Sequence, residues 1–325
     1  MQIDKYLKEK LYIEKLDALC FSMLSYLNFS DFIGKSFKEI EDIVPQYYFN
    51  VALKSFKLWK HIKKYSKYED VKVLDFKKDK TFSYLILNHN NEIFIAIRGT
   101  VSGISDWKED FEISYKKVDS YYKTKEILEN VKHFEKLIVC GHSKGGHLAM
   151  IFGGYASKYG IENVSIYNFD GPGFVKEKDL EVNSFSPTKS IVGTLFTNKN
   201  KKFVKTTRFL IMRQHLPIYW KISKDLDFVY KKQSFISRSF ENIANDWIDK
   251  TSIEDRKYFV DIIFAPLEES EIRKKKCVNG CHITKPKICF IDACKSYSNL
   301  SSIEKKFLLR KTIDFKNCIV NEFTN

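Results

Sequence analysis

The strongest constraint in this sequence is a glycine-rich turn between a strand-like run and a helix-like run. The apolar run L-I-V-C at 137–140 leads into G-H-S-K-G-G at 141–146, and H-L-A-M-I-F follows at 147–152. A serine on a sharp strand-to-helix turn, with small residues two places before and after it, is the pattern of a nucleophile elbow. Gly141 and Gly145 meet that need, and the flanking strand and helix give this common five-residue pattern its weight. We therefore predict that Ser143 is a nucleophile.

The segments around this turn predict a mixed sheet. Three runs with the period of strands, V-K-V-L-D-F, T-F-S-Y-L-I-L-N and E-I-F-I-A-I-R-G-T, follow one another from residue 71, with N-H-N-N as a turn between the second and third. They predict an antiparallel start. A helix at 119–135, the strand before the turn, the helix after it and the strand V-S-I-Y-N-F-D form a crossover pattern, which predicts a parallel second half covered by helices.

The two ends of the chain are predicted to be helical. Apolar residues between 16 and 27 recur at spacings of three and four and mark a helical segment within 1–66. Residues 176–202 are polar and irregular, residues 202–212 are expected to form one more strand, and the chain from 235 onward is expected to be helical. We predict one α/β-hydrolase domain over residues 1–234 and a helical C-terminal region over residues 235–325 packed on it.

A serine hydroxyl needs a base, usually histidine, and the base needs an orienting carboxylate. In this fold the chain order is serine, acid, histidine. Asp170 ends the strand after the elbow and His215 follows the last predicted strand, so both are assigned to the triad of Ser143. Asp170 could instead close the D-G-P-G turn, and His215 could be a packed loop residue. His142 is expected to fill the elbow and His147 to lie on the helix surface.

Two backbone N–H groups must stabilise the tetrahedral oxyanion. One comes from the residue after the nucleophile, which is Lys144. The other comes from a loop after an earlier strand, and the strand end I-R-G-T, with Gly99 before Thr100, is the candidate. The alternative interpretation of I-R-G-T is an ordinary strand end.

The segment I-A-I-R-G-T-V-S-G-I-S-D-W-K-E-D-F at 95–111 resembles the class 3 lipase pattern, in which a strand ends in R-G-S/T and a Trp and an Asp follow. The resemblance implies that Thr100 supplies an oxyanion-hole amide and that its hydroxyl helps. It also implies that Asp106, Trp107 and Asp110 support this loop.

A second resemblance is to a bacterial family of uncharacterised lipase-like α/β-hydrolases. Its motifs G-H-S-K-G-G, D-G-P-G-F, S-I-V-G and Q-H stand here at 141–146, 170–174, 190–193 and 214–215, and the match covers about residues 16–220. Class 3 lipases usually carry their acid after the next strand, where this chain has S-I-V-G, so Asp170 is the substitute. After Q-H the family often has Asp, whereas this chain has Leu216 and Pro217.

These features favour a serine hydrolase that cleaves an acyl ester; the resemblance adds a lipid or phospholipid as the substrate. The alternative is a catalytically silent hydrolase fold that acts as a binding or interaction protein. The net charge of +14 could steer the chain to an anionic membrane, although lysines are spread along the whole sequence, and no nucleic-acid motif is found. The stretch 176–202 is either a lid or a surface loop.

Seven cysteines, an odd number, fit a reducing compartment. No signal-peptide run and no apolar run of the ~20 residues that span a bilayer are found, so a cytoplasmic protein is expected. Tetrahedral zinc is one interpretation of the cluster Cys277, Cys281, His282, Cys289 and Cys294. Its spacing departs from that of the well-known zinc fingers, so we expect reduced thiols and neither metal nor cofactor.

Overall fold

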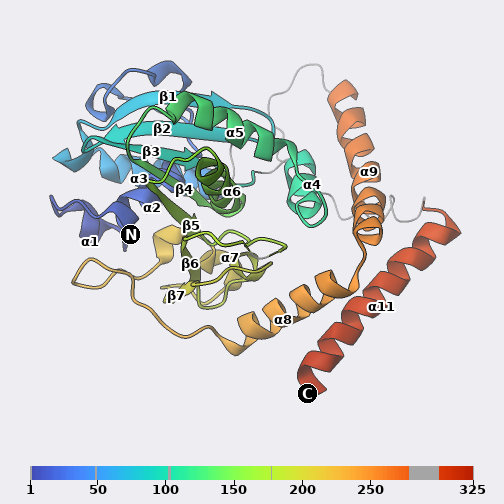
Figure 1. Cartoon of the computed structure of the whole chain (residues 1–325). Helices are drawn as coiled ribbons and strands as arrows, with labels where there is room; N and C mark the ends of the chain where they lie inside the picture. Colours follow the sequence, from blue (N-terminus) through green and yellow to red (C-terminus); the bar gives the residue numbers. More distant parts are fainter. Residues whose placement is uncertain (1, 48–49, 102–103, 177, 278–299, 325) are drawn as a thin grey trace.

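A mixed seven-stranded sheet forms the centre of the molecule (Figure 1). The structure is a computed structural model that describes residues 2–47, 50–101, 104–176, 178–277 and 300–324. The strands, which lie side by side in chain order, are β1 (Lys72–Lys78), β2 (Ser83–His89), β3 (Glu92–Ile97), β4 (Leu137–His142), β5 (Val164–Phe169), β6 (Asn183–Pro187) and β7 (Lys202–Val204). The first three pair antiparallel, and β3 to β7 pair parallel. The predicted α/β fold with a sheet that is antiparallel at first and then parallel is confirmed.

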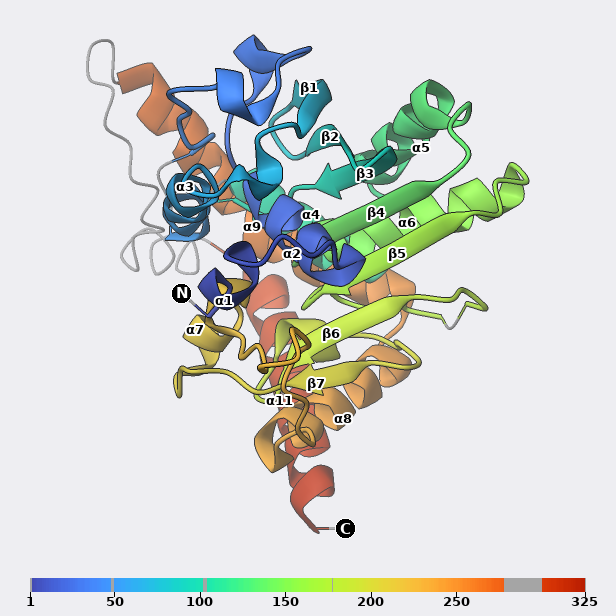
Figure 2. The same ribbon diagram turned by 90° about the vertical axis from the view of Figure 1, so that its left-hand side faces the viewer.

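Helices cover both faces of this sheet, as the two views together show (Figures 1 and 2). The α-helices are α1 (Asp4–Leu7), α2 (Glu14–Leu24), α3 (Asn50–Ile62), α4 (Ile104–Glu112), α5 (Asp119–Val131), α6 (Lys144–Lys158), α7 (Ile211–Gln214), α8 (Phe235–Lys250), α9 (Ile253–Cys277) and α11 (Ser302–Thr324). Short 3₁₀ helices are η1 (Ser30–Phe32), η2 (Phe37–Glu39), η3 (Ser66–Tyr68), η4 (Val192–Thr194) and η5 (Pro217–Tyr219).

Strand β4 shows why the sheet has a core on each side. Successive side chains of a strand point to opposite faces. Ile138 and Cys140 join the core formed with α2 and α3, whereas Leu137 and Val139 join the core formed with α5 and α6. All six residues of β4 are buried, which explains the unbroken apolar run before the elbow.

Two strand predictions are corrected by the structure. Residues 176–202 contain β6, in which Ser184 and Ser186 are buried; Ser184 Oγ accepts a hydrogen bond of 2.6 Å from Asn198. Residues 202–212 do not form one strand, because β7 ends at Val204. The backbone of the residues that follow forms hydrogen bonds with residues 219–229 instead of with the sheet. The apolar residues that suggested a longer strand are exposed, Phe209 by 80%.

The C-terminal helices lie beside the sheet and contact the rest of the chain. Helix α9 packs on α4, where the rings of Phe111 and Phe264 lie 5.4 Å apart and Lys108 Nζ lies 2.9 Å from Glu268 Oε2. Within the described parts of the chain, no helix has the length and apolar character needed to cross a membrane. The division between residues 234 and 235 stays a prediction.

Candidate active site

Ser143 sits on a strained turn between β4 and α6. Its φ of 57° and ψ of −133° lie in a region that non-glycine residues rarely adopt. A Cβ on Gly141 would lie 2.1 Å from Gly145 O, and one on Gly145 would lie 2.1 Å from Ile97 O, so both positions require glycine. Such strain, about 1–3 kcal/mol, persists only where the surroundings fix it. The local geometry is that of the elbow expected from the sequence.

Asp170 and His215, 45 residues apart in sequence, are brought together at the same edge of the sheet. His215 Nδ1 lies 2.7 Å from Asp170 Oδ2. Asp170 is buried, and its other carboxylate oxygen accepts a hydrogen bond from the Ser190 hydroxyl. Since Nδ1 faces the carboxylate, the ring nitrogen left for contact with a nucleophile is Nε2, which makes no hydrogen bond to a described residue.

A second histidine places the His215 loop beside the elbow. The ring centroids of His142 and His215 lie 4.5 Å apart, and His142 Nε2 lies 2.8 Å from the His215 carbonyl oxygen. Burial, assisted by His215, holds the pKa of His142 well below its usual range, so the ring is neutral. Its one N–H therefore donates to that carbonyl, and Nδ1 accepts from Tyr26 at 3.0 Å.

The structure does not join all three proposed triad residues by hydrogen bonds. Asp170 and His215 are paired, but among the described residues the Ser143 hydroxyl has no hydrogen-bond partner, His215 included. Bonds between nucleophile and base are often long in ligand-free enzymes and tighten when substrate binds.

The loop after β3 lies against the elbow. A Cβ on Gly99 would lie 2.3 Å from His142 O and 3.1 Å from Ser143 Cβ, so Thr100 follows directly beside the nucleophile. The Thr100 hydroxyl donates to Asp110 Oδ2 at 2.7 Å. Among the described contacts, the next backbone N–H, that of Val101, donates to Asp106 Oδ2 at 2.7 Å.

Two of the three residues that were expected to support this loop contact it. Asp106 and Asp110, both from α4, hold it by hydrogen bonds. Trp107, between them in sequence, is 44% exposed and does not share this role among the described contacts.

The side chain of Lys144 has a role that the sequence analysis missed. It is buried, and its Nζ contacts Asp106, lies 3.0 Å from Glu109 Oε2 and lies 3.9 Å from Asp110 Oδ1. Burial raises the pKa of Asp110 to about 7, although the charge of Lys144 opposes this. The three carboxylates in turn outweigh the burial of Lys144 and raise its pKa. A signal was present, because acids at i, i+3 and i+4 share one face of a helix.

One further histidine differs from its expected role, and one serine has a role that was not predicted. His147 is buried rather than on the helix surface, because its two ring nitrogens bond to Tyr121 Oη and Gly173 O, at 2.5 and 2.9 Å. Burial lowers the pKa of His147 to about 4, so it is neutral. Ser190, at the head of the S-I-V-G motif, orients the acid and donates nothing to His215 itself.

The cysteine cluster cannot be placed. Residues 278–299, which include Cys281, His282, Cys289 and Cys294, lie outside the described residues, as does the side chain of Cys277. Within the described ranges, no group of three or more His, Cys, Asp or Glu side chains is arranged to hold a metal ion.

One protein-family model matches this chain. A family model described as Mbeg1-like matches residues 59–265, more than half of the chain. A search of curated proteins gave no match. Among solved structures, a crystal structure of a mutant form of MDLA from Penicillium cyclopium is similar, with a TM-score of 0.27 and 16% identity over 50% of this chain and 64% of that one. The match thus spans less than two-thirds of the length of that protein.

Proposed function

This chain belongs to the Mbeg1-like family, and we propose that it is a serine hydrolase that cleaves an acyl ester. One observation carries the proposal: a buried Asp170 paired with His215 at 2.7 Å, at the sheet edge where Ser143 occupies a strained elbow. The alternative role of Asp170, a plain turn residue, does not account for its contact with an imidazole.

In this mechanism His215 Nε2 accepts the proton of the Ser143 hydroxyl while Ser143 Oγ attacks the ester carbonyl carbon. The backbone N–H groups of Thr100 and Lys144 hold the oxyanion of the tetrahedral intermediate. His215 then gives its proton to the leaving alkoxide, and water, activated in the same way, hydrolyses the acyl-serine. Asp170 keeps Nδ1 protonated and stabilises the imidazolium.

The substrate class is proposed to be a lipid or phospholipid, presented at an anionic membrane surface. The loop before His215 carries Phe209, Leu210 and Met212, which are 80%, 58% and 72% exposed, between Arg208 and Arg213. Exposed apolar groups edged by basic side chains are typical of surfaces that enter a lipid interface.

The membrane contact is tested by sedimentation with vesicles of phosphatidylglycerol or of phosphatidylcholine. We expect binding to the anionic vesicles, lost in Phe209→Asp and retained in Ile303→Asp, a matched change at an exposed site on α11. Equal binding by both variants would show that this loop does not make the contact.

The nucleophile is tested with a fluorophosphonate probe and with hydrolysis of p-nitrophenyl butyrate. We expect labelling and turnover in the wild type and in Ser157→Ala, an exposed serine on the same helix, and neither in Ser143→Ala. Labelling that persists in Ser143→Ala would refute the assignment.

A catalytically silent fold is the second candidate, favoured by the lack of a described hydrogen bond between Ser143 and His215. It predicts neither labelling nor turnover in a wild-type protein that is fully folded by circular dichroism.

A further inference from the structure

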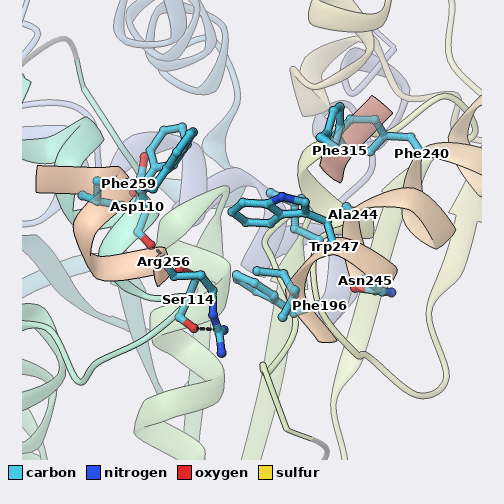
Figure 3. Close-up of a pocket in the computed structure, with 14 residues that line it drawn as sticks. Asp110, Ser114, Phe196, Phe240, Ala244, Asn245, Trp247, Arg256, Phe259 and Phe315 are labelled. Atoms are coloured by element: carbon cyan, nitrogen blue, oxygen red, sulfur yellow. Dashed lines mark hydrogen bonds between the residues drawn. The ribbon is translucent and has the colours of Figure 1, made fainter. Parts of the chain in front are cut away.

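An apolar cavity of about 210 Å³ lies between α4, α8, α9, α11 and the loop after η4 (Figure 3). Its wall includes Phe196, Ala244, Trp247 and Phe259. Figure 3 shows the Trp247 indole in the middle of the group, with Asp110 and Phe259 on one side and Phe240 and Phe315 on the other. The C-terminal helices thus form much of this wall.

Two walls of the cavity are connected to residues of the proposed active site. On one side Asp110 lines the cavity and also accepts the hydrogen bond of Thr100, the oxyanion residue. On the other side Phe196 lines it, in the loop that leaves η4. Within η4, a Cβ on Gly193 would lie 2.3 Å from Asp170 Oδ1, so this loop packs on the proposed acid. The cavity therefore lies between α4, which holds Thr100, and the loop that packs on Asp170.

The interior of the cavity has the character of a ligand site rather than of a packing defect. Its lining is mainly apolar, yet two buried atoms of its lining residues make no hydrogen bond to a described residue: Trp247 Nε1, and Asp110 Oδ1, whose ion-pair partner Lys144 Nζ lies 3.9 Å away. Buried polar atoms are nearly always paired, so such orphans call for an explanation. Phe196 has a φ of 63°, a strained value for a bulky residue of the kind found at ligand clamps.

We propose that this cavity holds the acyl chain of the ester, so that α8 and α9 belong to the substrate site. The inference rests on the proposed function and assigns its acyl pocket. The family match, which runs to residue 265, includes α8 and the first half of α9. Since a dry cavity of roughly 150 Å³ takes up benzene, this one suits a chain of roughly six to ten carbons.

The acyl pocket is tested by filling it. Ala244→Leu places three more carbon atoms on a buried position of the wall, and Arg238→Leu makes a matched change on the exposed side of α8. With p-nitrophenyl esters from acetate to dodecanoate, we expect the ratio of kcat/KM for octanoate to kcat/KM for acetate to fall at least tenfold in Ala244→Leu. Arg238→Leu should leave the whole profile unchanged. If Ala244→Leu fails to fold, Ala244→Val is the milder variant.

A binding measurement keeps the two proposals separate. Sodium octanoate, titrated calorimetrically into wild type, should bind, with at least tenfold weaker binding to Ala244→Leu and unchanged binding to Arg238→Leu. This result without any ester hydrolysis would support the acyl pocket and refute the hydrolase. Hydrolysis with an unaltered chain-length preference in Ala244→Leu, or no binding of octanoate to wild type, would overturn the acyl pocket and leave the hydrolase standing.

Discussion

Replacing Lys144 by methionine tests the buried charge cluster behind the elbow. The change keeps an unbranched side chain only one heavy atom shorter and removes its charge, which leaves Asp106, Glu109 and Asp110 without their shared cation. Removing one partner of a buried ion pair costs about 3–5 kcal/mol, because the remaining charge is left uncompensated. We expect Lys144→Met to lower the free energy of unfolding by that amount at pH 8.

The loss should shrink at lower pH. In the wild type the pKa of Asp110 is about 7, raised by burial, and Lys144 holds it down from a still higher value. Without Lys144 the folded state binds protons at a higher pH than the unfolded chain does, so the variant regains stability as the pH falls. Urea denaturation followed by circular dichroism at pH 8 and pH 5.5 measures both effects.

The control is Lys132→Met, which removes an exposed lysine paired with Glu129 one turn away on the helix surface. Exposed pairs of this kind contribute little, so no measurable change is expected. If Lys144→Met were no more destabilising than Lys132→Met at pH 8, the account of the buried cluster would be refuted. A loss of equal size at both pH values would point to packing rather than charge.

Three further predictions address the same region. Asp170→Asn should lower kcat for ester hydrolysis about 10⁴-fold, as for a triad aspartate. A loss of less than tenfold would indicate that Asp170 only stabilises the turn. Gly145→Ala should prevent folding because its Cβ would lie 2.1 Å from Ile97 O. Gly154→Ala, on the same helix, places its Cβ in open space and should raise the free energy of unfolding by up to about 1 kcal/mol. Equal melting temperatures of the two variants would contradict this prediction. Burial raises the pKa of Asp110 to about 7, so the free energy of unfolding of the wild type should fall as the pH rises from about 4 to 7. Asp110→Asn should lack this decrease, and the same pH dependence in both proteins, measured by urea denaturation, would contradict the prediction.

The elbow and the sheet were predictable because their signals are local. Small residues at fixed spacing around Ser143, and periods of two and 3.6, depend only on neighbours in sequence. Strand β6 was missed because its buried residues include Ser184, whose hydroxyl accepts a hydrogen bond from Asn198 in the connection between β6 and β7. The strand expected through Phe209 was wrong because its apolar side chains face solvent rather than a core.

Within the site, chain order placed Asp170 and His215 as partners, and the structure pairs them. The ring partners of His147, and the acids that surround the Lys144 side chain, come from segments 26 to 38 residues away. Side chains of this kind look like ordinary surface residues in a sequence, since nothing local shows that they will be buried. Long-range pairing of charges therefore had to be seen in three dimensions.

The position of α4 couples the elbow to the C-terminal helices. One side of this helix is held to the elbow through Lys144, and its other side packs on α9 through Phe111 and Phe264. The loop that carries Thr100 is thus held by Lys144, from the helix after β4, and indirectly by α9, which follows the sheet in sequence. Loss of the C-terminal helices would release α4 on one side and loosen the oxyanion loop, so a shortened chain could keep its nucleophile and still lose the rigidity on which turnover depends.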